Sequence, residues 1–140
     1  MNNQHIKIID ENEKEILQLL VNQDILPDFK IKNNKLIIEK YSTTLGNLEL
    51  NDDLTNELQI QINSLVDKIH DLNILHGDLH EHNILYNPQT NIVKILDFGQ
   101  SKLISELTDD DINYYNEFWD TNCESVSDLL KYEYTMWRWF

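Results

Sequence analysis

The chain has 140 residues, with 11 Lys and Arg against 25 Asp and Glu, and a formal net charge of -14. This acidic balance argues against direct nucleic-acid binding and against anionic membrane surfaces, because both require a basic patch. The hydrophobic share of 41% supports one core, so we expect a single domain over residues 1–140. The lone cysteine and the absence of an apolar signal sequence in residues 1–15 predict a cytoplasmic location. The abundance of Asn and Ile indicates an AT-rich genome.

The first third of the chain predicts one helix and one β-hairpin. A helix is expected over residues 10–21, where acidic residues come first and apolar residues follow. Residues 29–32 and 35–41 have strand character and are separated by Asn33-Asn34. Because Asn tolerates a left-handed backbone, this pair predicts a hairpin turn.

The rest of the chain predicts a long helix, short strands and further helices. A connector with one helical turn is expected over residues 42–50, followed by a helix over 52–72 whose apolar residues recur every three or four positions. Short apolar runs predict strands at 74–75, 83–86 and 92–96. Beyond residue 107, an acidic run precedes aromatic residues at helical spacing, and the C-terminus is strongly aromatic.

Two segments carry the chemistry: His76-Gly77-Asp78-Leu79-His80-Glu81-His82-Asn83, and Asp97-Phe98-Gly99. Asp78 and Asn83 lie five residues apart in one loop, and Asp97 ends a strand that could return beside that loop. Mg²⁺ prefers hard oxygen ligands and binds through few carboxylates plus substrate phosphates. A further carboxylate is then free to accept a hydroxyl proton. The set is therefore suited to phosphoryl transfer.

These segments resemble the catalytic loop and the metal-binding DFG motif of the protein-kinase-like superfamily. The resemblance implies that Asp78 is the catalytic base and that Asn83 and Asp97 hold the Mg²⁺ of bound ATP. Gly77 and His80 replace the Arg and Lys of ordinary members. This form is similar to aminoglycoside and choline phosphotransferases, lipopolysaccharide kinases and the small kinase of the KEOPS complex. By the same resemblance, His80 is a catalytic residue near the transferred phosphate.

The resemblance extends upstream of the loop. Residues 35–41 are similar to the last small-lobe strand and hinge, which implies that adenine binds near Glu39, Lys40 and Tyr41. Residues 13–20 resemble the small-lobe regulatory helix, which makes Glu13 the partner of the ATP-binding lysine.

The implied fold is α+β, a truncated protein-kinase-like fold. Its residual N-lobe and hinge strand span residues 1–41, and its shortened, mainly helical C-lobe spans 42–140. Residues 44–48 match the turn after the hinge, and the helix over 52–72 matches the one that precedes the catalytic loop.

The chain also departs from that pattern. No glycine precedes Gly46, so we expect the glycine-rich phosphate loop to be missing. The strand that carries the ATP-binding lysine is expected to be missing or severely shortened. Lys7 is the only lysine ahead of the regulatory helix and lies six residues before Glu13, closer than the family normally has it. Lys7 is therefore the candidate surrogate for the ATP-binding lysine. Without an Arg at Gly77, we expect no switch through a phosphorylated activation segment.

Two functions remain open at this stage. The first is an ATP- and Mg²⁺-dependent phosphotransferase acting on a protein Ser/Thr hydroxyl, although the sequence does not exclude a small-molecule acceptor. The second is an inactive pseudokinase or kinase mimic that binds a partner protein. A complex partner or a second copy of the chain could also complete the N-lobe.

Three local features have a structural interpretation beside a functional one. A zinc site at His76, His80 and His82 lacks a second set of Cys or His ligands. One of the acids at 109–111 could anchor the catalytic loop, although the run is also typical of a helix start. Core packing is expected for the C-terminal aromatic residues, with an interface as the alternative.

Overall fold

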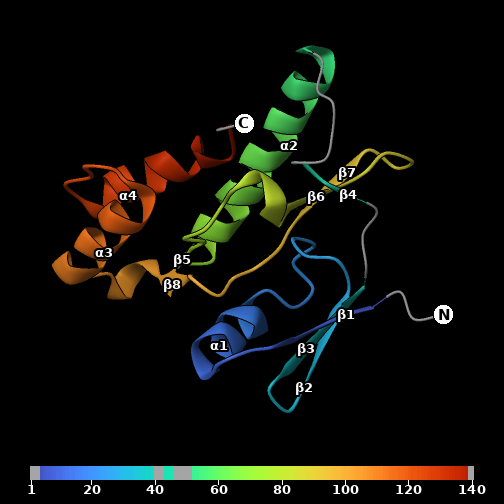
Figure 1. Cartoon of the computed structure of the whole chain (residues 1–140), viewed down its shortest axis with the longest axis horizontal. Helices are drawn as coiled ribbons and strands as arrows, with labels where there is room; N and C mark the ends of the chain where they lie inside the picture. The colour runs from blue at the N-terminus through green and yellow to red at the C-terminus, as the bar shows by residue number, and fades with distance from the viewer. Residues whose placement is uncertain (1–3, 40–42, 46–51, 139–140) are drawn as a thin grey trace.

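A computed structural model describes residues 4–39, 43–45 and 52–138 (Figure 1). The fold has two parts. The N-terminal part contains helix α1 and one sheet, and the C-terminal part contains the longest helix, α2, with short strands and two further helices around it. Mixed helices and antiparallel sheets confirm the α+β class.

The N-terminal sheet has the strand order β1-β3-β2, with both pairings antiparallel. Strands β2 (Phe29–Lys32) and β3 (Lys35–Glu39) form the predicted hairpin, and Asn33 at its turn has a φ of 58°. The first strand, β1 (Gln4–Ile8), is absent from the sequence-based assignment. All five of its residues are exposed, so it lacks the half-buried alternation by which a strand is normally recognised.

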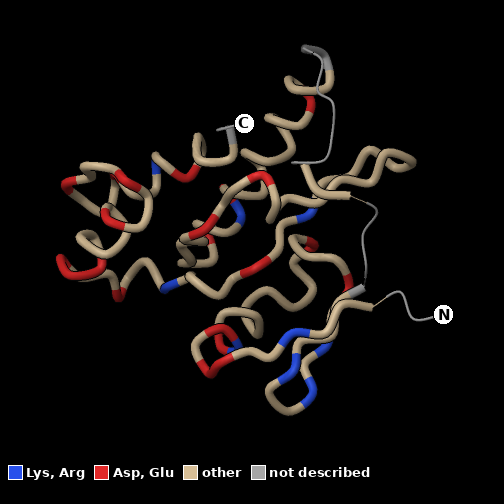
Figure 2. Tube along the Cα trace, viewed as in Figure 1, with Lys and Arg blue, Asp and Glu red and all other residues tan. Residues whose placement is uncertain are grey.

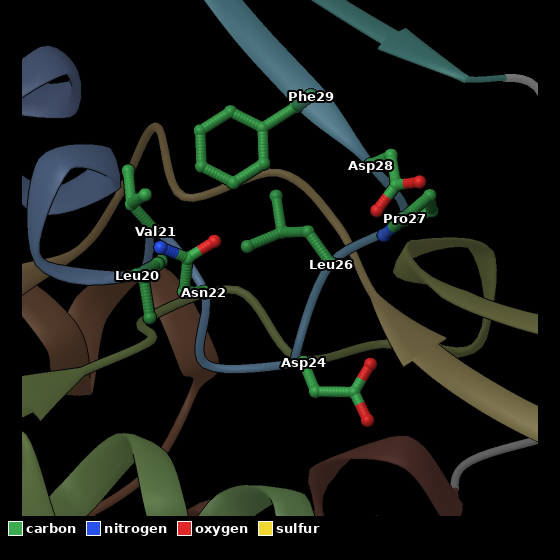
Figure 3. A pocket seen from close by; sticks show the side chains of 8 residues that line it. All are labelled: Leu20, Val21, Asn22, Asp24, Leu26, Pro27, Asp28 and Phe29. Atoms are coloured by element: carbon green, nitrogen blue, oxygen red, sulfur yellow. The ribbon is translucent and has the colours of Figure 1, made fainter.

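Helix α1 spans Glu11–Leu19, close to the predicted range of 10–21. It begins where the Asp10 side chain accepts a hydrogen bond from the Glu13 backbone N–H, which satisfies one of the free donors of the first turn. The segment after the helix turns back toward β2 and encloses a hollow of about 360 Å³. Figure 3 shows Leu26 and Phe29 directed into this hollow.

The C-terminal part is organised around α2, which confirms the predicted helix over residues 52–72. Two small antiparallel sheets flank α2: the sheet with strand order β4-β6-β7 lies on the side away from α3 and α4, and the β5-β8 pair lies near those helices. The predicted strands at 74–75, 83–86 and 92–96 are confirmed to within one residue. The elements are β4 (Thr43–Thr44), α2 (Asp52–Asp71), β5 (Ile74–Leu75), β6 (Ile84–Asn87), β7 (Ile92–Ile95), β8 (Lys102–Leu103), α3 (Asp109–Trp119) and α4 (Val126–Glu133), with 3₁₀ turns at Glu81–Asn83, Ile104–Glu106 and Met136–Arg138.

The connector predicted over residues 42–50 falls mostly outside the described residues. The part that is described contains β4, which pairs with β6, so a strand occurs there. The turn expected at 44–48 likewise lies largely outside the described residues.

One hydrophobic core joins the two parts. It is built on the buried face of α2 and includes buried residues of α1, the hairpin and the catalytic-loop region. Trp137 is 1% exposed and packs into this core, as expected for the C-terminal aromatic residues. Trp139 and Phe140 lie outside the described residues. Within the described part of the chain, no helix combines the length and the apolar character that a membrane span requires.

The two faces of α2 give a direct test of this core. Ile62 is fully buried, whereas Ile60 on the same helix is 72% exposed. We expect Ile62→Ala to lower the free energy of unfolding by about 2–5 kcal/mol, because the substitution removes buried methyl groups and leaves a cavity. Ile60→Ala, which makes the same chemical change at an exposed site, is expected to cost less than about 0.5 kcal/mol. Urea unfolding followed by circular dichroism measures both values, and equal losses would contradict the placement of the core.

Candidate active site

The loop between β5 and β6 is organised by the buried ring of His76, which is 1% exposed. Its Nε2 lies 2.8 Å from the Leu96 carbonyl oxygen, and its Nδ1 accepts a hydrogen bond from the Asp78 backbone N–H at 3.1 Å. Nε2 therefore carries the proton, and the ring is neutral in this geometry. Burial is the main reason that the pKa of His76 is lowered from 6.5, despite the nearby carboxylates.

Asp78, His80 and Asn83 come together in this loop, as the sequence predicts. The Asn83 Nδ2 donates to the Asp78 carbonyl oxygen at 2.8 Å and lies 3.4 Å from the Asp78 Oδ2. The His80 Nε2 lies 3.1 Å from the same amide nitrogen and 3.7 Å from the Asp78 Oδ1. Burial, supported by the negative charge of Asp97, raises the pKa of Asp78 against the opposing effect of the two histidines. A carboxylate with a raised pKa is a better proton acceptor than an ordinary one.

Asp97 follows β7 with a left-handed backbone, at a φ of 59°. Its Oδ1 accepts a hydrogen bond from the Gly99 backbone N–H at 3.2 Å. The next residue, Phe98, is fully buried and packs against the His76 ring with 4.6 Å between the ring centroids. Burial favours the protonated acid, but hydrogen bonds from Lys7 and Gly99 and the Lys7 charge outweigh it, so the pKa of Asp97 is lowered. Asp97 is therefore ionised at neutral pH.

Lys7 links Glu13 to Asp97. Its Nζ lies 3.1 and 2.9 Å from the two carboxylate oxygens of Glu13 and 3.1 Å from the Asp97 Oδ1. Burial lowers the pKa of Lys7, but the two neighbouring carboxylates outweigh burial, so the pKa of Lys7 is raised. Glu13 is 3% exposed, and burial raises its pKa despite the nearby lysine. The sequence predicts that the strand carrying the ATP-binding lysine is missing or severely shortened; in the structure a five-residue strand, β1, carries the candidate surrogate Lys7, at the position facing Leu36 of β3.

A buried carboxylate that sequence reasoning missed anchors the loop. Glu133, at the end of α4, is fully buried. Its Oε1 accepts from the His76 backbone N–H at 3.1 Å and lies 2.9 Å from the His70 Nε2, while its Oε2 accepts from the Gly77 backbone N–H at 2.7 Å. The interpretation of residues 109–111 as a helix start is confirmed, and the alternative that one of these acids anchors the loop is wrong, because Glu133 does so. Those acids begin α3, where Asp111 forms a capping box with the preceding threonine.

Gly77 allows the close packing behind Asp78. Its φ is +90°, and a Cβ there would lie 2.3 Å from the Gln100 carbonyl oxygen. The Gly77 carbonyl in turn accepts a hydrogen bond from the Trp119 Nε1 at 2.8 Å. A side chain at this position is excluded by both the backbone conformation and the available space.

The remaining predicted site residues belong to the segment that is expected to form the hinge. Glu39 is the last residue of β3, but its side chain and the residues Lys40 and Tyr41 lie outside what the structure describes. The adenine contacts predicted there stay a prediction.

Asp97 and Asn83 offer the oxygen donors that Mg²⁺ prefers. Asp97 is held ionised, and the Asn83 amide nitrogen is used in the loop, which leaves its amide oxygen for a cation. One carboxylate and one amide oxygen fit Mg²⁺ bound together with nucleotide phosphates. No group of three or more His, Cys, Asp or Glu side chains among the described residues could hold a metal by itself. The His76 Nε2 is occupied by a backbone carbonyl, so this histidine is not arranged as a zinc ligand.

Comparison with known proteins agrees with this geometry. The family model of the protein kinase domain matches residues 13–123. The chain belongs to the protein kinase domain family. Its members are phosphotransferases that generally use ATP and Mg²⁺. The matched range includes Glu13, Asp78, His80, Asn83 and Asp97 but not Lys7.

A solved structure supports the same fold. The kinase-domain chain is similar to the Cydia pomonella granulovirus kinase PK-1, with a TM-score of 0.62 and 17% sequence identity. The match covers 95% of this chain and 58% of the PK-1 chain, so the kinase-domain chain spans little more than half the length of that protein. No curated relative matches the sequence.

The buried histidine predicts how stability depends on pH. Because the pKa of His76 is lower in the folded state than its ordinary value of 6.5, the unfolded state binds more protons as the pH falls below that value. We therefore expect the thermal midpoint to fall between pH 7.0 and 5.5. His76→Gln is expected to lower the midpoint at pH 7.0 and to flatten this slope, whereas His82→Gln, which removes a 61% exposed ring, keeps the wild-type slope. An unchanged slope in His76→Gln, measured by differential scanning fluorimetry, would rule out this histidine as the cause.

Proposed function

We propose that this chain is an ATP- and Mg²⁺-dependent kinase that transfers a phosphoryl group to a Ser or Thr hydroxyl of a protein. The observation that carries the proposal is the position of the Lys7 Nζ, bonded to Glu13 and Asp97 at once. In protein kinases, a strand lysine that pairs with an αC glutamate binds the ATP phosphates. Lys7 and Glu13 provide that pair in this chain.

The proposed roles follow from the contacts of each side chain. Asp97 and Asn83 hold Mg²⁺, which neutralises phosphate charge when bound. Asp78 orients the acceptor hydroxyl and accepts its proton, for which its raised pKa is suited. His80, close to Asp78 and Asn83, contacts the transferred phosphate through its ring.

Adenine would be met by the hinge at the end of β3, near Glu39, Lys40 and Tyr41. This part of the proposal rests on the similarity of residues 35–41 to a kinase hinge strand. The choice of a protein hydroxyl as acceptor rests on the membership in the protein kinase domain family.

Substitution of the proposed base tests the activity. Asp78→Asn removes the proton acceptor but keeps the side-chain shape, so we expect transfer of labelled phosphate from ATP to a mixed protein substrate to fall by about 10²–10⁴-fold. The thermal midpoint is expected to change little. Asp109→Asn, which removes an exposed carboxylate from the start of α3, is the matched control and keeps wild-type activity. Phosphate transfer that persists unchanged in Asp78→Asn would refute the assignment.

Nucleotide binding is tested separately with Lys7→Met. MgATP binds only the folded state and should raise the thermal midpoint of the wild-type protein. Lys7→Met keeps much of the apolar stem but removes the ammonium group, so we expect the midpoint shift at millimolar MgATP to be lost. No shift in the wild-type protein would favour the inactive kinase mimic instead.

A second candidate is a kinase domain whose N-lobe is completed by another copy of the chain. The observation that favours it is β1, which lies at the edge of its sheet and has Ile6 and Ile8 57% and 78% exposed. An exposed edge strand can pair with a strand of another molecule. In this case specific activity and the mass measured by light scattering rise together with protein concentration, and Ile6→Lys suppresses both. A monomer with concentration-independent activity excludes this candidate.

A further inference from the structure

A second cavity lies beside the catalytic loop. Its volume is about 350 Å³, and it opens between that loop and the C-terminal helices. Two of its residues belong to the loop, and the others lie at the end of α3, in α4 and in the turn that follows. The lining residues are Leu79, His80, Trp119, Asp120, Tyr132 and Met136.

Direct contacts tie this cavity to the proposed catalytic base. His80 lines it, and the His80 Nε2 lies 3.7 Å from the Asp78 Oδ1. On the other side, the Trp119 Nε1 donates to the carbonyl oxygen of Gly77, the residue before Asp78. A group bound in the cavity therefore lies next to a hydroxyl that Asp78 would orient.

The lining combines aromatic rings with one carboxylate. The Trp119 and Tyr132 rings are stacked, with centroids 5.3 Å apart and an interplanar angle of 22°. Asp120 is the exposed C-cap of α3, in the left-handed conformation at a φ of 57°, and its backbone N–H donates to the Asn116 carbonyl oxygen. Burial raises the pKa of Tyr132, and the negative charge of Asp120 adds to this effect, which places the two groups within electrostatic reach.

These features have the chemistry of a cation site. Aromatic faces attract ammonium and guanidinium groups, and a carboxylate at the same opening adds charge complementarity. The six lining residues include neither Lys nor Arg. The His80 Nδ1 accepts a hydrogen bond from the His82 backbone N–H, which fixes the orientation of the ring at the edge of the cavity.

We propose that this cavity binds a Lys or Arg side chain of the protein acceptor, close to the hydroxyl that receives the phosphoryl group. The proposal rests on the proposed function and names its substrate class, a basic peptide. The whole molecule favours the same class, because a net charge of -14 attracts cationic peptides. Figure 2 shows acidic residues concentrated around α3 and α4, whereas basic residues are few there.

Asp120→Asn is the variant that tests the site. Asn is well tolerated in the left-handed conformation, so the substitution removes the charge and keeps the helix end. Asp110→Asn is the matched control, because it makes the same change of net charge at an exposed position of the same helix, in the first turn. Neither side chain belongs to the proposed catalytic machinery.

The substrates are Ser-centred peptides in which a single Lys occupies each flanking position in turn. Norleucine at the same position provides a side chain of similar length without charge. For at least one position, we expect Lys to lower KM by about two- to fivefold relative to norleucine. Asp120→Asn is expected to abolish this preference, and Asp110→Asn to retain it. Equal KM values for the two series in the wild-type protein would overturn the proposal while leaving the kinase assignment intact. An equal loss of the preference for Lys over norleucine in both variants would do the same.

A binding measurement separates this proposal from the activity on which it rests. Fluorescence anisotropy of the labelled Lys and norleucine peptides is measured with each protein in the absence of ATP. If no peptide is phosphorylated, the proposed function fails, but tighter binding of Lys peptides that is lost only in Asp120→Asn still supports the cation site. Equal binding of both series, or no binding of either, overturns it.

Discussion

The catalytic loop depends on one buried carboxylate, that of Glu133. Burying a polar group is costly unless hydrogen bonds replace its water, and Glu133 has backbone donors from His76 and Gly77 and a contact with His70. The loop can therefore form in this shape only when α4 is docked behind it. Conversely, the buried carboxylate is stable only when the loop presents its two N–H groups. The C-terminal helix is thus part of the active-site framework, although it contributes no proposed catalytic group.

The same loop is joined to the DFG segment by a second set of bonds. The Ser101 Oγ donates to the His76 carbonyl, the His76 ring meets the Leu96 carbonyl, and Phe98 packs on that ring. Gly99 lies close to the Asp97, Glu13 and Lys7 side chains. A Cβ there would lie 3.2 Å from the Asp97 Oδ1 and 3.5 Å from atoms of the Lys7 and Glu13 side chains. A Cβ would therefore be tight only against the Asp97 Oδ1, and glycine leaves this carboxylate its room.

The features that the sequence predicts correctly are those with local signals. The β2–β3 hairpin is marked by two asparagines between strand-like runs, and α2 by apolar residues at helical spacing. The loop residues Asp78 and Asn83 are fixed by their separation of five positions, and they lie together as expected. The approach of Asp97 to this group depends on the return of β7: the Leu96 backbone N–H donates to the Asn83 carbonyl oxygen at 2.8 Å, and the negative charge of Asp97 contributes to the raised pKa of Asp78.

The features that the sequence does not reveal depend on distant contacts. Glu133 lies 57 residues from the His76 backbone that it anchors, and nothing in its immediate surroundings distinguishes it from a surface acid. Strand β1 has exposed apolar residues, so it gives no signal of burial; only its pairing with β3 defines it. Lys7 could be identified as a candidate because it is the only lysine ahead of α1, but its role becomes evident only once β1 is placed.

The short connection from β1 to α1 has a consequence for regulation. Only Ile9 and Asp10 separate the two elements, and the Ile9 backbone N–H donates to the Asn34 carbonyl in the hairpin turn. Asp10 then caps α1, and Glu13 lies in the first turn, next to Lys7. With so short a link, α1 cannot swing outward without breaking both the cap and the contact with the hairpin. The short link therefore favours the Lys7–Glu13 pair in the folded chain, and regulation of the proposed activity by an outward movement of α1 would cost both contacts.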